Sequence, residues 1–198
     1  SASAADATYV GVAPTLSTDA LSGRSVVTFD GSAGQRMRAH PPAAAPYSIF
    51  SVSRLTGGLN ARLVGSIYPD NRNWLLGFWN GWESVAYAEG FFNSHQTAAT
   101  TDWHQYSLCA NASTATFRDA GNDFDTTGNT VGPNGGIALG GYAATTTEEL
   151  SNGQIAEVVM FDSELSTPNR QKVEGYLAHR YALTAALPSN HPHRTTPP

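Results

Sequence analysis

The sequence predicts an all-β fold in which two antiparallel sheets form a jelly-roll sandwich, accompanied by one C-terminal α-helix. Three observations predict it: many short apolar segments separated by turn residues, 19 Gly and 11 Pro among 198 residues, and one late segment with helical spacing. Strands spaced in this way are typical of a sandwich, and a chain of this length can bury a substantial core.

The predicted strands begin with a pair formed by residues 9–16 and 21–31. The turns after Tyr47 contain Gly, Pro, Asn or Asp, and Asn80-Gly81 between two aromatic segments is the best hairpin signal among them. Other predicted turns are Gly57-Gly58, Pro69-Asp70-Asn71, Ala110-Asn111-Ala112 and Gly135-Gly136. The remaining predicted strands are residues 47–55, 61–68, 73–79, 83–88, 103–110, 113–118, 137–142 and 154–161.

The segment from Ile155 to Leu183 marks where the fold ends. Its first part has apolar residues on both faces, as in a strand of a buried sheet. Ser166 then serves as a helix N-cap, and Pro168 occupies the first turn, where a missing N–H has no cost. We expect one buried stripe from four residues at helical spacing: Val173, Tyr176, Leu177 and Tyr181.

Charge and composition argue against several classes of function. A formal net charge of −5, without any basic run, argues against a nucleic-acid partner. No apolar segment approaches the ~20 residues that cross a bilayer, so no membrane insertion is expected. Cys109 is the single cysteine, which excludes an intrachain disulfide, and its alternating surroundings predict a small core residue.

The chain divides into one domain and two end segments. Residues 1–8 are small and polar, as in a linker or a tag remnant. Residues 9–187 form the predicted domain. Residues 188–198 are rich in Pro, so we expect a tail that lies extended on the surface.

An aromatic cluster is the first candidate site. Seven aromatic residues fall between Trp74 and Phe92, close to polar residues that can bind sugar hydroxyl groups. Alternation places Trp74, Leu76 and Phe78 on one face, and most of the cluster is compatible with a sandwich core. The predicted carbohydrate-binding residues are Trp79, Asn80, Trp82, Glu83 and Tyr87, with Trp82 and Tyr87 as stacking platforms.

The acidic run from Asp119 to Asp125 is the second candidate site. Oxygen ligands at short spacing in a loop that contains Gly are what Ca²⁺ prefers, and the expected ligands are Asp119, Asp123 and Asp125. The run lacks the order of an EF-hand loop. Asp and Asn also favour turn geometry, so a solvated hairpin explains the same residues without an ion.

The histidines do not predict a zinc site. His191 and His193 are the only close pair, and no third ligand lies nearby in the sequence, whereas a catalytic zinc needs three protein ligands. His104 follows Trp103 at a predicted strand start, where a structural role is expected.

Four segments in the same order resemble laminin-G-like domains of the concanavalin A-like lectin/glucanase superfamily. They are ALSGRSVVTFDG from Ala20, NWLLGFWNGWESVAYAEGFF from Asn73, DWHQYSL from Asp102 with TATFRDAGND, and the closing segment from Ile155. The resemblance spans residues 9–193 and implies the concanavalin A-like jelly roll. It also implies a calcium site on a rim loop, without matching its ligands residue by residue.

The superfamily includes enzymes, but their signatures are missing from this sequence. Its glucanases carry Glu-x-Asp-x-x-Glu on one strand, and its lyases carry an Arg-rich strand and a Gln-x-His strand; neither pattern occurs here. Glu148 and Glu149 are adjacent and would point to opposite faces of a strand, while Glu83 and Glu89 have the spacing to share one. We therefore expect a protein without catalytic activity.

Two functions remain after these exclusions. The first is a lectin-like module that binds a glycan or surface polysaccharide and mediates adhesion, in the extracellular space or at the cell surface. The alternative is a structural or attachment protein at a virion surface, such as a capsid decoration or tail-fibre domain, whose partner is a coat or surface protein. One fold hosts both functions, so the choice depends on the site.

Overall fold

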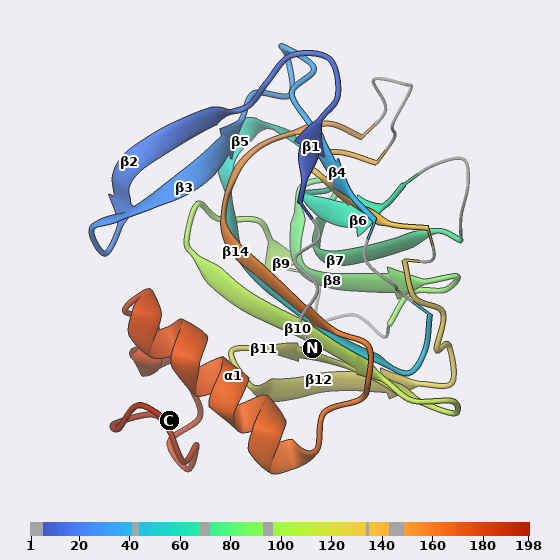
Figure 1. The fold of residues 1–198 in the computed structure, drawn as a ribbon, viewed down its shortest axis with the longest axis vertical. Coiled ribbons are helices and arrows are strands. Elements are labelled where there is room, and N and C mark those ends of the chain that lie inside the picture. Colours follow the sequence, from blue (N-terminus) through green and yellow to red (C-terminus); the bar gives the residue numbers. More distant parts are fainter. Residues whose placement is uncertain (1–5, 41–43, 68–71, 93–96, 134, 143–148) are drawn as a thin grey trace.

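The computed structural model describes residues 6–40, 44–67, 72–92, 97–133, 135–142 and 149–198. Within them, two seven-stranded antiparallel sheets pack face to face (Figure 1). Helix α1 (Thr167–Arg180) and the short 3-10 helix η1 (Thr184–Ala186) follow the last strand. The structure thus confirms the predicted sandwich with a C-terminal helix. No helix in this described part has the length and apolar character needed to cross a membrane.

The two sheets are built from strands that are mostly distant in sequence. Sheet A contains, in spatial order, β1 (Thr8–Tyr9), β4 (Met37–Ala39), β13 (Ile137–Leu139), β6 (Val64–Ser66), β7 (Trp74–Trp79), β8 (Trp82–Ala88) and β9 (Thr97–Ala98). Sheet B contains β12 (Asn122–Thr127), β11 (Ala115–Asp119), β10 (His104–Ala110), β5 (Tyr47–Asn60), β14 (Ser151–Phe161), β3 (Arg24–Phe29) and β2 (Thr15–Leu21).

The main core lies between the sheets. Trp74, Leu76 and Phe78 project into it from β7, which confirms that these three residues share one face. Trp74 is fully buried, and its indole N–H donates a 3.0 Å hydrogen bond to the hydroxyl of Tyr47 on the opposite sheet. This pairing satisfies the one polar atom that the indole brings into the core.

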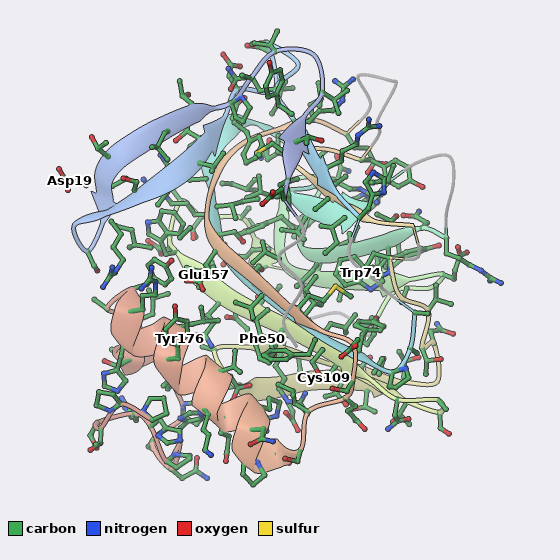
Figure 2. The ribbon with its side chains drawn as sticks, viewed as in Figure 1. Asp19, Phe50, Trp74, Cys109, Glu157 and Tyr176 are labelled. Atoms are coloured by element: carbon green, nitrogen blue, oxygen red, sulfur yellow. The ribbon has the colours of Figure 1, made fainter. Side chains whose placement is uncertain are left out.

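A second apolar cluster lies between sheet B and helix α1 (Figure 2). It contains Phe50 and Cys109 from the sheet and Leu177 and Tyr181 from the helix, so the predicted core position of Cys109 is confirmed. The expected helix stripe is wrong at Tyr176, which is 42% exposed. Tyr176 lies at the edge of the helix face, and its hydroxyl donates to Glu157 on β14.

Several strand boundaries differ from the prediction because the sheets contain irregularities. The predicted turn at Gly57-Gly58 is instead part of β5, which absorbs positive φ angles of 91° and 79° and continues to Asn60. The backbone at Gly58 favours glycine because its φ is in the left-handed region, and a Cβ there would also displace the Asn152 side chain, whose nitrogen would lie 2.6 Å away. Strands β4, β9 and β12 were not predicted, whereas β6 and β13 are shorter than expected.

Some predicted features lie outside the described residues. These are residues 1–5 of the expected linker, the turn at Pro69-Asp70-Asn71, and Glu148.

The C-terminal tail differs from the expected extended segment. Its backbone turns twice, with His191 N donating to Pro188 O and Arg194 N to His191 O. His191 is buried, and its Nε2 lies 3.2 Å from Oε2 of Glu174 on α1. Glu174 also accepts a hydrogen bond from Arg170. A buried carboxylate needs such partners, so the tail completes the polar environment of the helix.

Candidate functional site

A tight turn positions the first pair of aromatic residues. Asn80 and Gly81 have φ angles of 50° and 84°, as a two-residue type I′ hairpin turn requires. Trp79 and Trp82 are therefore cross-strand partners on the same face of sheet A. The predicted hairpin at Asn80-Gly81 is confirmed, and the Trp82 side chain remains 40% exposed.

A β-bulge brings Tyr87 to the same face. Residues 82 and 87 are an odd number apart, so regular alternation would place them on opposite faces. Phe78 pairs with Glu83 and Gly77 pairs with Val85, which leaves Ser84 as an extra residue, with a φ of 58°. The extra residue reverses the alternation.

Phe91 completes the group by folding back onto this face. Its ring centroid lies 5.2 Å from that of Trp79 and 4.8 Å from that of Tyr87. Phe91 is 45% exposed. We call the four residues Trp79, Trp82, Tyr87 and Phe91 the aromatic face. It lies on the outer side of sheet A, opposite the core side occupied by Trp74 and Phe78.

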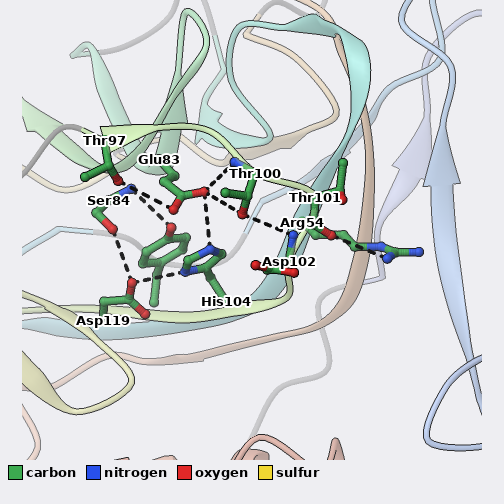
Figure 3. A network of polar contacts seen from close by, with 10 residues as sticks. Arg54, Glu83, Ser84, Thr97, Thr100, Thr101, Asp102, His104 and Asp119 are labelled. Carbon is green, nitrogen blue, oxygen red and sulfur yellow. Dashed lines mark hydrogen bonds and ion pairs between the residues drawn. The ribbon is translucent and has the colours of Figure 1, made fainter. Parts of the chain in front are cut away.

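Glu83 does not join the other predicted binding residues. It is buried, and its Oε2 accepts hydrogen bonds from the amide of Thr100 at 2.7 Å and from its hydroxyl at 3.0 Å (Figure 3). Its carboxylate also lies 3.4 Å from Nε2 of His104. Glu83 thus anchors the segment after β9 to β8. Asn80, in contrast, is exposed at the tip of the turn beside the aromatic face.

His104 connects the two sheets through carboxylates on either side of its ring. Its Nδ1 lies 3.1 Å from Oδ2 of Asp119, which also accepts a 3.2 Å hydrogen bond from the Ser84 hydroxyl (Figure 3). Burial by itself lowers the pKa of His104, but the hydrogen bond and charge of Asp119, with the charges of Glu83 and Asp102, raise it overall. This arrangement gives His104 a structural role.

Asp119 and Asp123, two of the three aspartates predicted as calcium ligands, have different partners. Asp119 points toward His104, whereas Asp123 forms an ion pair with Arg118. They belong to the β11–β12 hairpin, whose turn is Ala120-Gly121. Within the described residues, no group of three or more His, Cys, Asp or Glu side chains could hold a metal ion. Calcium binding at this hairpin stays a prediction of the sequence.

Glu83 and Glu89 have different hydrogen-bond partners. Glu83 faces inward to Thr100, whereas the carboxylate of Glu89 accepts a 2.8 Å hydrogen bond from the amide of Asn73. The two glutamates with the spacing to share a face are therefore bound to different elements. A retaining glycosidase needs two carboxylates about 5–5.5 Å apart that flank the substrate.

A polar cluster that was not predicted from the sequence lies beside the aromatic face. Arg62 is 1% exposed and forms an ion pair with Glu149. Its Nη1 donates to Oδ1 of Asn73 at 2.9 Å, and its guanidinium carbon lies 3.9 Å from the ring centroid of Tyr142. Burial lowers the pKa of Arg62, and the charge of Glu149 opposes that effect.

Glycine in β6 makes room for this arginine. A Cβ at Gly65 would lie 2.8 Å from Cδ of Arg62, so the arginine side chain lies directly against the sheet. No sequence motif marks this cluster, because Arg62, Asn73, Tyr142 and Glu149 come from four separate segments. Of the residues that form this arrangement, only Arg62 and Gly65 lie close together in the sequence.

Comparisons with known proteins identify similar folds. No protein-family model matches the sequence, and no curated protein matches it. Domain 4 of AbnA, an extracellular GH43 arabinanase of Geobacillus stearothermophilus in complex with arabinotriose, has a TM-score of 0.58 and 16% identity, covering 81% of this chain and 84% of that one.

Two further solved structures extend this likeness. Botulinum neurotoxin type C, whose cell entry depends on interaction with two ganglioside molecules, has a TM-score of 0.57 and 11% identity, covering 87% of this chain and 46% of the toxin chain. A GH54 α-L-arabinofuranosidase has a TM-score of 0.55 and 14% identity, covering 78% and 41%. This chain spans less than half of those two proteins. At such identities the likeness establishes a shared β-sandwich fold.

Proposed function

We propose that this chain is a non-catalytic carbohydrate-binding module whose ligand stacks on the aromatic face. The observation that carries the proposal is the gathering of Trp79, Trp82, Tyr87 and Phe91 on the outer side of sheet A, with two of the rings more than one-third exposed. Exposed apolar groups that cluster in this way mark binding surfaces. Flat aromatic rings suit the C–H faces of sugars, and Asn80 offers an amide for hydroxyl groups.

The environment of the acidic residues supports binding without catalysis. Glu83 and Asp119 are held by Thr100, Ser84 and His104 at the rim between the sheets. A general acid and a nucleophile must both reach the glycosidic bond of a bound sugar. These two carboxylates instead serve as acceptors within the protein.

The proposal includes the family and the setting of the module. The order of the four sequence segments and the sandwich fold support a laminin-G-like domain of the concanavalin A-like superfamily. We infer that it serves recognition or adhesion as part of a larger assembly, in the extracellular space or at the cell surface.

The second candidate is a virion attachment or decoration domain. The same exposed aromatic rings favour it, since a coat protein that covered them would remove apolar surface from water. In that case the partner of the aromatic face is a protein rather than a glycan.

The decisive experiment compares Trp82→Ala with Tyr176→Ala on a glycan array and by titration with arabinotriose and a ganglioside oligosaccharide. Tyr176 is a matched control because it is similarly exposed but lies on helix α1. We expect Trp82→Ala to weaken glycan binding at least about tenfold, or about 1.4 kcal/mol, and the control to bind normally. Wild-type protein that binds no glycan above background would refute the proposal. A stable complex with a coat protein would then establish the alternative.

A further inference from the structure

We propose that Glu149, held by Arg62, forms a second subsite that accepts hydrogen bonds from the hydroxyl groups of a neutral sugar unit. This inference rests on the proposed function and names the class of ligand: neutral oligosaccharides that extend from the aromatic face toward Glu149, in preference to sialylated or uronic acid-containing ones.

The two parts of the site are neighbours on one face of the sheet. Gly65 of β6 pairs with Leu75 of β7, which pairs with Tyr87 of β8. Gly65 and Tyr87 therefore lie on either side of Leu75, each one strand spacing of about 5 Å away, and the Arg62 side chain lies against Gly65. We infer that a ligand on Tyr87 and Phe91 extends over the buried Leu75 toward Glu149, the exposed member of the ion pair.

Glu149 is held in place by Arg62. Its φ of 52° lies in the left-handed region, as at seven other described residues that are not glycine, so the backbone alone does not mark a site. The ion pair with Arg62 secures it, because a buried guanidinium without a carboxylate partner would be strongly destabilising. The Glu149 side chain is nevertheless 35% exposed. A carboxylate has about four acceptor positions, more than the Arg62 contact uses.

The pocket beside Glu149 has room for a sugar unit. Its volume is about 480 Å³. Its walls include Gly31, Ser32, Gly34 and Ala61, whose small side chains leave the space open. At Gly31 a Cβ would lie 3.1 Å from the backbone of Ser151, so a larger residue would disturb the wall. Ala61 also accepts a hydrogen bond from Asn80 N, which places the pocket next to the turn of the aromatic face.

The charges around the subsite favour a neutral ligand. Glu149 accepts from Arg62, and Glu89 accepts from the amide of Asn73, whose side chain in turn binds Arg62. Two carboxylates are thus placed on either side of Asn73. A ligand carboxylate beside these two glutamates would face like charges, whereas hydroxyl groups can donate to their oxygens. Arg36 places one cation at the wall, where its Nη1 donates to Gly34 O, so the preference for neutral ligands depends on contact with Glu149.

The test uses a glycan array of neutral, sialylated and uronic acid-containing oligosaccharides, with wild-type protein, Glu149→Gln and Glu164→Gln. Glu164 is the control because its carboxylate binds Asn111 at the far side of sheet B. We expect the wild type to bind neutral oligosaccharides more tightly than acidic ones. Glu149→Gln should bind the best neutral oligosaccharide at least about tenfold more weakly, and its preference for neutral over acidic oligosaccharides should be smaller. The control should match the wild type.

A second variant guards against loss of folding, since Glu149→Gln leaves Arg62 with a weaker partner. Ser32→Trp fills the pocket and keeps the ion pair. Its control is Ser113→Trp. Ser113 lies in a turn of sheet B, and its amide donates to the Asn111 side chain, as the Ser32 amide donates to the Asp30 side chain. We expect Ser32→Trp to weaken binding of trisaccharides more than of monosaccharides.

The outcomes separate this inference from the function on which it rests. If Trp82→Ala loses binding while Glu149→Gln and Ser32→Trp bind like the wild type, the second subsite is wrong and the binding module stands. A wild type that prefers acidic oligosaccharides also overturns the subsite. Wild-type protein that binds no glycan removes both.

Discussion

The outer faces of the two sheets differ in what covers their apolar side chains. On sheet B, Phe50 and Cys109 are sealed beneath helix α1 by Leu177 and Tyr181. On sheet A, the aromatic face is covered by no helix in the described part of the chain (Figure 1). Both faces are apolar, but only the first is removed from water. The difference separates residues that stabilise the fold from residues that are available to a ligand.

This contrast also explains why aromatic content alone is a weak guide to function. Trp74 and Trp82 lie eight residues apart on paired strands, yet one is fully buried and the other is 40% exposed. Trp74 contributes packing and a hydrogen bond to the core. Trp82 contributes an open ring. Substitutions on the sealed face should therefore change stability, and substitutions on the open face should change binding.

The largest effect is expected on the sealed face. Leu177→Ala removes a fully buried side chain and leaves a cavity against Phe50, so we expect the free energy of unfolding to fall by about 2–5 kcal/mol. Denaturant unfolding followed by circular dichroism measures it. Glycan affinity of the folded fraction should not change. A loss below about 1 kcal/mol would mean that the helix does not seal sheet B.

The next largest effect is expected on the open face. Phe91→Ala removes the ring that lies between Trp79 and Tyr87, and we expect glycan affinity to fall by roughly 1 kcal/mol or more, or about fivefold. Titration calorimetry measures the affinity, and thermal unfolding serves as the control. If the melting temperature falls sharply while the affinity of the folded protein is unchanged, Phe91 belongs to the core rather than to the site.

The fold could be predicted from local patterns because those patterns record burial and turns. The alternation in β7 and β10, the Asn80-Gly81 turn and the Pro168 helix start all act over a few residues. Boundaries failed where a strand continues through irregular geometry. In β14, the register shift between Ile155 and Glu157 moves Ile155 to the core side with Val158, against simple alternation.

The site was only partly predictable for the same physical reason. Trp79, Asn80, Trp82 and Tyr87 come together as expected, but the face of Tyr87 depends on the bulge at Ser84. The same strand turns Glu83 inward. The Arg62–Glu149 pair joins two segments that are distant in sequence, which no local pattern contains.

A smaller effect is expected from pH, because His104 links sheet A to sheet B. Burial opposes the charge of His104, but Asp119, Glu83 and Asp102 together raise its pKa above 6.5. The stabilisation from the charged ring is fully present below about pH 6.5 and is lost as the pH rises through the raised pKa. We expect His104→Gln to abolish this dependence when unfolding free energies are compared between pH 6 and 9. A wild-type stability that increases across this range, and does so more than in His104→Gln, would contradict the assignment.

The smallest effect, on the melting temperature, is expected from removing divalent cations. The acidic run from Asp119 to Asp125 predicts a larger effect, because its residue types suit Ca²⁺. Asp119 already accepts a hydrogen bond from Ser84 and contacts His104, and Asp123 forms an ion pair with Arg118. A calcium ion would therefore have to compete with these partners. We therefore expect the melting temperature to be the same in EDTA and in millimolar Ca²⁺ when measured by calorimetry. Asp125→Asn should behave like the wild type in both. The opposite result would be a wild-type melting temperature that falls in EDTA and returns with Ca²⁺, with no such response in Asp125→Asn. That result would show that the hairpin rearranges to bind the ion. The rim of sheet B would then contribute to function as well as the open face of sheet A.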